Sequence, residues 1–295
     1  MTTSETTSTP TFHQSMTAPL RRVLVKRPDG AFAVDDPSAW HYAARPDLAA
    51  AQAEHDAFTA LLREAGAEVV YHEVDQPTRA DSVFVYDPAL ITNDGAILLQ
   101  LGKALREGEA EALGQQLGAL GVPVIGRLTG EQRAEGGDMF WLDDRTLAVG
   151  RTFRTNEAGV AALRELLEPR GVTVLAYDMP VYDGAEACLH LMSVISPLAP
   201  DTAVVYPRLM PVPLWQELQR RQMRLIEIPD AEFPTQASNV LALSPTACVM
   251  LAGNPVTQQR LEDAGFTVHT YVGNELSLKA EGGPTCLTKP LLRRA

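Results

Sequence analysis

The amino-acid sequence predicts an α/β fold made of five similar units that pack in a circle. Three observations indicate this fold. The same order of elements recurs about every fifty residues, a polar or reactive residue stands near the start of each unit, and the fifth unit is complete only when the two chain ends are combined. A unit of this size cannot bury its apolar face alone, so its neighbours must pack against it around a common axis. An ordinary α/β sheet with accidental spacing is the alternative.

Each of the first four units reads as two buried strands, a helix and a third strand, because short apolar runs precede a stretch of helical periodicity. The units begin near 87, 138, 188 and 238, and their helices are expected near 107–119, 156–168, 213–222 and 255–264. The residues at corresponding positions, 51, 52, 49 and 47 residues apart, are Asp87, Asp138, His190, Asn239 and Cys286. This regular spacing indicates one repeated structural unit.

The fifth unit begins at Cys286 and stops after a single strand, CLTKPLLRR. Its missing elements stand at the other end of the chain, as a strand at 21–28, an amphipathic helix at 47–66 and a strand at 67–74. The chain ends then close the circle, and the first strand of each unit brings its start towards the centre. We therefore expect the residues at these starts to lie near one another, although they are far apart in sequence.

Composition limits the protein classes. Hydrophobic residues make up 45% and charged residues 21% of the 295-residue chain, which is ordinary for a globular protein. We expect a disordered leader over 1–17, rich in Ser and Thr, and a single domain over 18–295. The net charge of −12 argues against nucleic acid and anionic membranes as partners. No apolar run reaches the roughly 18 residues of a membrane span, so we expect a cytoplasmic protein.

The cysteines are candidates for catalysis rather than for cross-links. Three cysteines without a Cys-x-x-Cys pair exclude a disulfide framework and a cysteine-based zinc site, and we expect neither metal nor cofactor. Cys286 follows Gly-Gly-Pro-Thr, where the backbone can approach closely and its N–H groups can hold a thiolate. A buried structural cysteine is the alternative. Cys188 and Cys248 lie in apolar strand patterns and are expected to be structural.

A histidine and two carboxylates could complete a catalytic site. His190 is the one histidine inside an otherwise apolar strand, ACLHLMSV. Such a histidine is more often part of the core, but its place at a unit boundary favours catalysis. Glu135 and Asp138 flank two glycines at a strand entrance. One can orient an imidazole while the other binds a cationic substrate, and a polar turn is the alternative.

Two further aspartates, Asp81 and Asp87, frame an apolar stretch that contains Phe84. Acids around an aromatic face suit a planar guanidinium, which combines charge, hydrogen-bond donors and a flat surface. The loop 29–46, rich in Asp, Ala and Pro, is a candidate lid over such a site.

Three motifs in fixed order carry a family resemblance. Glu-Gly-Gly-Asp at 135–138, Leu-His-Leu at 189–191 and Gly-Gly-x-x-Cys at 282–286 resemble the guanidino-group-modifying enzymes, or penteins. These include dimethylarginine dimethylaminohydrolase, arginine deiminase and amidinotransferases. The resemblance covers the chain from about Arg21 to Arg293 and implies a five-bladed, pseudo-symmetric ββαβ propeller closed by the chain termini.

Within that group the sequence looks most like dimethylarginine dimethylaminohydrolase, because of the stretch DSVFVYDPALIT and two arginines that follow it. The resemblance implies Cys286 as nucleophile, His190 as general acid/base and Glu135 as its partner. The implied substrate contacts are Asp87 to the guanidinium, Asp81 and Phe84 along the pocket, and Arg106 and Arg154 to a substrate carboxylate.

Two positions depart from the family patterns. Met192 stands where arginine deiminases carry a second Asp after the histidine, which disfavours simple arginine deimination. Tyr86 stands where the dimethylarginine enzymes typically carry Glu. Both departures bear on how the substituted guanidine would fit.

The sequence thus predicts a cysteine hydrolase that attacks the guanidino carbon of an arginine derivative through a covalent thiouronium intermediate. Dimethylarginine or monomethylarginine would give citrulline and dimethylamine or methylamine. The alternatives are an arginine deiminase-type hydrolase, an amidinotransferase, and a catalytically silent propeller that binds a macromolecule. The expected partner is a small guanidino substrate with a carboxylate, and a homodimer stays open.

Overall fold

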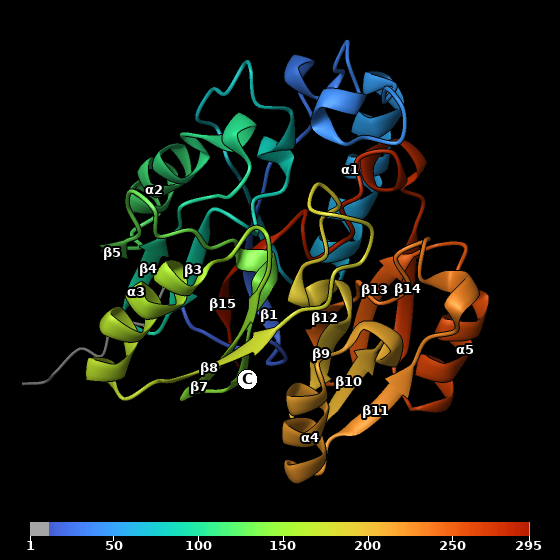
Figure 1. Cartoon of the computed structure of the whole chain (residues 1–295). Coiled ribbons are helices and arrows are strands. Elements are labelled where there is room, and N and C mark those ends of the chain that lie inside the picture. The colour runs from blue at the N-terminus through green and yellow to red at the C-terminus, as the bar shows by residue number, and fades with distance from the viewer. Residues whose placement is uncertain (1–11, 295) are drawn as a thin grey trace, which may run out of the picture.

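The computed structural model describes residues 12–294, which form five three-stranded sheets with one α-helix for each sheet (Figure 1). The four sheets within the chain are β3 (Ala89–Thr92), β4 (Gly95–Leu98) and β5 (Val124–Arg127); β6 (Met139–Asp143), β7 (Thr146–Arg151) and β8 (Thr173–Asp178); β9 (Ile195–Ala199), β10 (Thr202–Val205) and β11 (Arg224–Glu227); and β12 (Leu241–Ser244), β13 (Ala247–Leu251) and β14 (Thr267–Tyr271). In each sheet the middle strand pairs antiparallel with the first and parallel with the third. The expected order of strand, strand, helix and strand is confirmed.

The helices connect the parallel strands of each sheet. Parallel neighbours cannot be joined by a tight hairpin and need a crossover, which a helix supplies. The helices lie at the periphery, outside the sheets (Figure 1). They are α1 (Leu48–Glu64), α2 (Glu109–Ala119), α3 (Glu157–Leu167), α4 (Val212–Arg220) and α5 (Pro255–Asp263), each within two residues of its expected ends.

Local sequence explains why these helices form where they do. The side chain of Asn156 accepts a hydrogen bond from the N–H of Gly159 and caps the start of α3. Val160, Leu163 and Leu167 then follow at helical spacing and are buried against their own sheet. The apolar face of α3 therefore fixes its position on that sheet.

The fifth sheet combines both ends of the chain. β15 (Lys289–Arg293) pairs antiparallel with β1 (Leu20–Val25), which pairs parallel with β2 (Glu68–Tyr71). Leu24 and Leu291 of this sheet are buried in one cluster with Leu98, Leu113 and Leu117 of the neighbouring unit. The prediction that the two ends complete one unit is confirmed.

The expected leader over 1–17 is only partly covered by the described residues. Residues 1–11 lie outside the described residues, but 12–17 lie against the body of the protein. The N–H of Gln14 donates to Oδ1 of Asn93, and the N–H of Asn93 donates to Oε1 of Gln14. The side-chain Nε2 of Gln14 donates to the carbonyl of Asp144 at 2.6 Å. The prediction of disorder is therefore wrong for 12–17, because the buried side chain of Gln14 bonds to the turns between β3 and β4 and between β6 and β7.

One strand begins later than its apolar pattern indicated. β9 starts at Ile195, so Cys188 and His190 precede it rather than lying within it, and Cys188 is exposed. The intervening residues 191–193 form a 3-10 turn. The apolar residues before β9 thus belong to a turn whose side chains Leu191 and Met192 are buried, and not to a longer strand.

Among residues 12–294, no helix combines the length and apolarity needed to cross a membrane.

We expect Leu291→Ala to lower the free energy of unfolding by about 2–5 kcal/mol, because it leaves a cavity between the fifth unit and its neighbour. Leu291 is 0% exposed, whereas Leu105 is 44% exposed. Leu105→Ala is the matched control and should change stability by no more than about 0.5 kcal/mol. Urea unfolding of both variants tests this, and equal losses would contradict the packing role of β15.

Candidate active site

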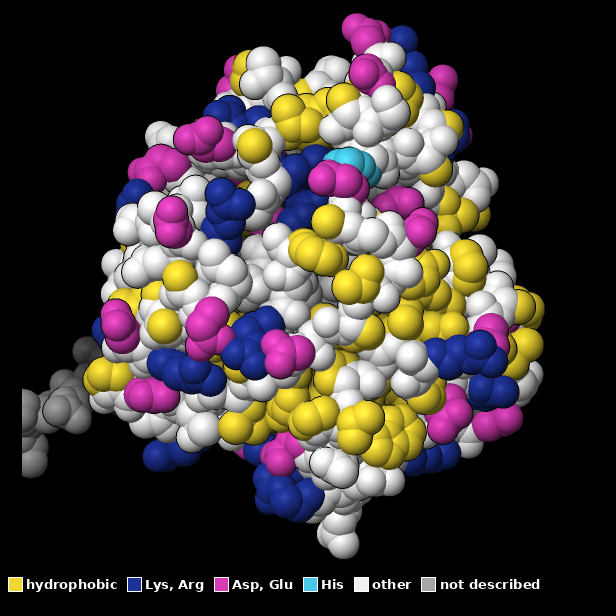
Figure 2. Space-filling view, viewed as in Figure 1, with side chains coloured by type: hydrophobic (Ala, Val, Ile, Leu, Met, Phe, Trp, Pro, Cys, Tyr) yellow, Lys and Arg dark blue, Asp and Glu magenta, His cyan; other side chains and the backbone are white. Residues whose placement is uncertain are grey.

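A cavity of about 390 Å³ collects most of the residues that the sequence analysis singled out. The predicted site residues on its wall are Asp81, Phe84, Asp87, Arg106, Glu135, Arg154, His190 and Cys286. They come from segments far apart in sequence, and several stand just before the first strand of a unit. On the face shown in Figure 2, acidic and basic side chains and a histidine lie side by side in its upper half. The expectation that unit boundaries meet is confirmed for these residues.

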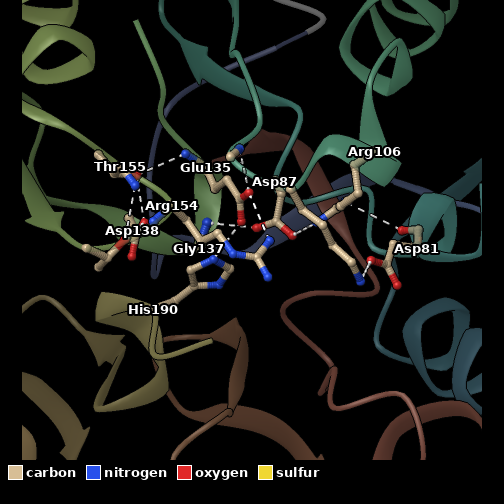
Figure 3. A network of polar contacts seen from close by, with 12 residues as sticks. Asp81, Asp87, Arg106, Glu135, Gly137, Asp138, Arg154, Thr155 and His190 are labelled. Atoms are coloured by element: carbon tan, nitrogen blue, oxygen red, sulfur yellow. Dashed lines mark hydrogen bonds and ion pairs between the residues drawn. The ribbon is translucent and has the colours of Figure 1, made fainter. Parts of the chain in front are cut away.

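His190 and Glu135 form a buried ion pair. The Nε2 atom of His190 lies 2.8 Å from Oε2 of Glu135 (Figure 3). The other carboxylate oxygen, Oε1, accepts the N–H of Gly102 at 2.8 Å. A Cβ at Gly137 would lie 2.3 Å from Nδ1 of His190, so only glycine leaves room for the imidazole ring at this place. The Gly-Gly pair between the two carboxylates is thus a packing requirement.

The two partners shift each other's pKa in opposite directions. Burial by itself raises the pKa of Glu135, but the hydrogen bond and charge of His190, with help from Arg154, hold it well below its ordinary range. Burial by itself lowers the pKa of His190, but Cys188, Asp138 and Glu135 outweigh it and hold that pKa well above its ordinary value. The pair therefore favours an imidazolium beside a carboxylate, and an imidazolium can donate a proton.

Asp138 lies outside the cavity wall, so the prediction that it binds substrate is wrong. It is 0% exposed and accepts hydrogen bonds from the hydroxyls of Thr152 and Thr155 at 2.8 and 2.6 Å. Its other oxygen accepts the N–H of Leu191 at 3.1 Å. Burial raises the pKa of Asp138 to about 6. This carboxylate anchors the backbone next to His190 and does not face the substrate.

Cys286 lies beside an asparagine of the preceding unit. The Nδ2 of Asn239 lies 3.3 Å from the Sγ of Cys286 and donates to it. Burial and the charge of Asp87 raise the pKa of the Cys286 thiol to about 11, although His190, Asn239 and the N–H of Gly283 favour the thiolate. The thiol therefore needs further positive charge nearby before it ionises at neutral pH.

Asp87 is held rigidly at the cavity wall. Its Oδ1 accepts the N–H of Gly137 at 2.9 Å, and its Oδ2 accepts from Nη1 of Arg106 at 2.7 Å. Arg106 also donates to Glu109 and to the carbonyl of Phe84. The buried guanidinium of Arg106 is thus already shared between two carboxylates, which does not fit the prediction that it binds a substrate carboxylate.

Asp81 belongs to a second ion-paired group at the mouth. It accepts from the hydroxyl of Tyr42 at 2.9 Å and from Nζ of Lys103 at 2.6 Å. Lys103 also donates to the carbonyl of Trp40 and lies 5.0 Å from the centre of its ring. Tyr42 and Trp40 belong to the loop 29–46, so the candidate lid is tied to the cavity wall. Its movement stays a prediction.

Arg154 lies on the cavity wall opposite this group. Its Nη1 is 3.4 Å from Oε1 of Glu135, a longer contact than that between Glu135 and His190. Figure 3 shows Arg154 between the His190–Glu135 pair and Asp87, with its guanidinium turned towards the centre of the site. Among the described residues it is the arginine on this wall that no second carboxylate holds.

Tyr86 and Met192, the two departures from the family patterns, do not line this cavity. Both line a separate cavity of about 50 Å³ together with Lys289 and Arg293. Nζ of Lys289 lies 4.4 Å from the centre of the Tyr86 ring. The neighbours Asp87 and Tyr86 thus contribute to different cavities.

Several wall residues were missed by the sequence analysis. Asn239 was found as a repeat position but given no role, although its fifty-residue spacing from His190 and Cys286 was the signal. Lys103 and the exposed thiol of Cys188 carried no sequence signal for the cavity. Within residues 12–294, no three His, Cys, Asp or Glu side chains are grouped as metal ligands.

Comparison with known proteins identifies the family of the chain. The family described as "N,N dimethylarginine dimethylhydrolase, eukaryotic" matches residues 40–291. An N(G),N(G)-dimethylarginine dimethylaminohydrolase of Pseudomonas aeruginosa is 26% identical over 83% of this chain and 89% of its own length. One of Streptomyces coelicolor is 29% identical over 92% and 96%.

The fold agrees as well. A structure of the Pseudomonas aeruginosa enzyme complexed with citrulline superposes with a TM-score of 0.76 at 22% identity, and covers 92% of this chain and 98% of that one. The motifs around Glu135, His190 and Cys286 fall within the matched range. The chain therefore belongs to the dimethylarginine dimethylaminohydrolase family of amidine hydrolases.

Proposed function

We propose that the protein hydrolyses the guanidino group of a methylated arginine to citrulline and methylamine or dimethylamine. The observation that carries this proposal is that one cavity contains the Cys286 thiol, the His190–Glu135 ion pair and the Asp87 carboxylate. Relatives from two bacteria bear the name of that activity. The proposal extends their substrate to this chain.

Substrate binding prepares the nucleophile. Asp87 would accept hydrogen bonds from the planar nitrogens of the guanidinium, since Arg106 and the N–H of Gly137 hold its carboxylate in place. The substrate cation brings positive charge next to Cys286, which favours loss of the thiol proton to solvent. The thiolate then attacks the guanidino carbon and forms an S–C bond.

His190 supplies and recovers one proton. The imidazolium donates a proton to the departing amine as the C–N bond breaks, which leaves a thiouronium bound to Cys286. The neutral imidazole then takes a proton from a water whose oxygen adds to the same carbon. As the S–C bond breaks, the hydroxyl of the tetrahedral intermediate gives its proton to the departing sulfur, so citrulline is released, the Cys286 thiol is restored and His190 is again an imidazolium. Glu135 stabilises that charged form throughout.

The two arginines have different parts in this proposal. Arg106 orients Asp87, because its guanidinium is already bound to Asp87 and Glu109. We assign the substrate carboxylate to Arg154, whose single contact with Glu135 is long. The division differs from the sequence expectation, which gave both arginines the same role.

We also propose that the five sheets close into a five-bladed propeller around the cavity. Every sheet has the same strand order, and the unit completed by both chain ends packs against the unit of β3 and β4. Residues from the starts of the units line one cavity. A closed ring accounts for both observations.

The wild type should release citrulline from dimethylarginine and monomethylarginine faster than from arginine or agmatine. Amine and citrulline release are measured for each compound, and an arginine–glycine pair tests amidino transfer. Cys286→Ser should reduce turnover by about a thousandfold or more, since it removes the covalent step. Turnover of none of these compounds would overturn the hydrolase proposal, and transfer to glycine would favour an amidinotransferase.

Asp87→Asn should lower kcat/KM by about a hundredfold or more, because it removes the negative charge that holds a cationic substrate. Asp75→Asn, at an exposed position outside the cavity, is the matched control and should leave kcat/KM unchanged. Steady-state kinetics on both variants test the anchor. A normal kcat/KM in Asp87→Asn would show that another group binds the guanidinium.

Glu135→Gln should move the alkaline limb of the kcat/KM profile to lower pH. The hydrogen bond to the Glu135 carboxylate contributes to the raised pKa of His190, and a neutral amide in its place lowers that pKa. Activity requires protonated His190, so activity is lost at a lower pH as pH rises. Glu64→Gln, an exposed residue at the end of α1, should leave the profile in place. An unmoved alkaline limb in Glu135→Gln would mean that His190 is not the group that titrates.

A further inference from the structure

Asn239 touches the sulfur of Cys286 through a fixed amide group. The N–H of Thr285 donates to Oδ1 of Asn239 at 3.0 Å, so this oxygen has its partner. The Nδ2 must then face the other way, where Sγ of Cys286 lies 3.3 Å away. The orientation of the amide therefore follows from the backbone that leads to the cysteine.

Close packing holds Asn239 in that orientation. A Cβ at Gly283 would lie 2.5 Å from Cγ of Asn239, so the glycine lets the loop 282–286 press directly against the amide. Asn239 is 9% exposed and lies on the cavity wall. Its side chain is thus fixed on both sides before any substrate arrives.

The charges around Cys286 explain why a neutral donor suits this position. Asp87 faces the sulfur and disfavours a thiolate, whereas His190 favours it. Tyr86 and Tyr271 also lie near, but burial raises the pKa of both hydroxyls and keeps them uncharged at neutral pH. An amide N–H adds a donor to the sulfur without drawing in another ion.

The repeat itself shows what the alternative would be. The corresponding residues of the first two units are aspartates, Asp87 and Asp138, whereas the fourth unit has an amide. A carboxylate at 239 would have similar shape but would place a negative charge beside a developing thiolate. Asn239 thus provides a neutral side chain at the repeat position that lies next to the Cys286 sulfur.

We propose that Asn239 is a positioning residue that holds the Cys286 sulfur and stabilises its thiolate through the Nδ2–H···Sγ hydrogen bond. The inference deepens the proposed function, since it rests on Cys286 as the nucleophile. It assigns to the fourth unit a part in the same reaction as the first, second, third and fifth.

The test measures the ionisation of Cys286 directly, without substrate. The wild type, Asn239→Ala and Asn239→Asp are labelled with iodoacetamide between about pH 6 and about pH 10, below the pKa of about 11 of the Cys286 thiol, where the labelling rate rises in proportion to the thiolate fraction. Labelling is read by mass spectrometry of the peptide that contains Cys286, and the displacement of this rising limb along the pH axis gives the shift of the midpoint. Asn239→Ala should raise the midpoint by about one pH unit, and Asn239→Asp by more. The exposed Cys188, followed in the same samples, should keep its labelling profile.

A control variant and an activity measurement separate a positioning role of Asn239 from a general effect on folding. Asn93→Asp, in the turn between β3 and β4, tests the effect of an Asn-to-Asp change elsewhere and should move no midpoint. Citrulline release should fall in both Asn239 variants, and more in Asn239→Asp. Lost activity with an unmoved Cys286 midpoint would overturn the inference. A wild type that releases no citrulline would instead overturn the proposed function.

Discussion

A fully buried carboxylate, Glu135, sets the conditions for the whole site. Taking such a charge out of water is unfavourable unless every lone pair finds a partner. Glu135 meets that requirement with the imidazole of His190, the N–H of Gly102 and the guanidinium of Arg154. Each partner comes from a different segment, so the ion pair can form only when several units are already in place. Folding and preparation of the acid/base are therefore one event.

The surrounding framework serves the geometry of that pair. Asp138 holds the backbone of Leu191 and, through the hydroxyl of Thr155, the backbone of Glu135. The two strand entrances that carry the ion pair are thus joined by a second, buried carboxylate. Gly137 leaves space for the imidazole between them. Replacing Asp138, Thr155 or Gly137 would therefore act first on the position of His190 relative to Glu135.

Spacing in the sequence predicted the repeat, its elements and the meeting of Asp87, His190 and Cys286, because chain order and periodicity report which residues start each unit. The other predicted wall residues came from side-chain chemistry and from the family resemblance. Whether a side chain faces the cavity or the protein interior was harder to predict. Asp138 occupies a unit boundary like Asp87, yet it faces the interior. Its carboxylate can be buried there because the hydroxyls of Thr152 and Thr155 donate hydrogen bonds to it. Arg106 was expected to meet substrate, but Glu109, three residues later, helps to hold it. Such side-chain pairings depend on tertiary contacts that no single-chain pattern encodes.

Tertiary contacts also determine which cavity Tyr86 and Met192 line. The family resemblance implies acids at both positions, so both residues would be read as altered contacts to the guanidine. Their side chains instead line the smaller cavity, with Lys289 over the ring of Tyr86. Any influence on substrate must pass through the adjacent backbone, because Tyr86 precedes Asp87 and Met192 follows His190 by two residues. In the proposed reaction, the groups that contact the substituted nitrogen would come from the larger cavity, where Phe84 and Leu189 supply apolar surface. The proposed selectivity for a methylated guanidine would then depend on shape and desolvation beside Asp87.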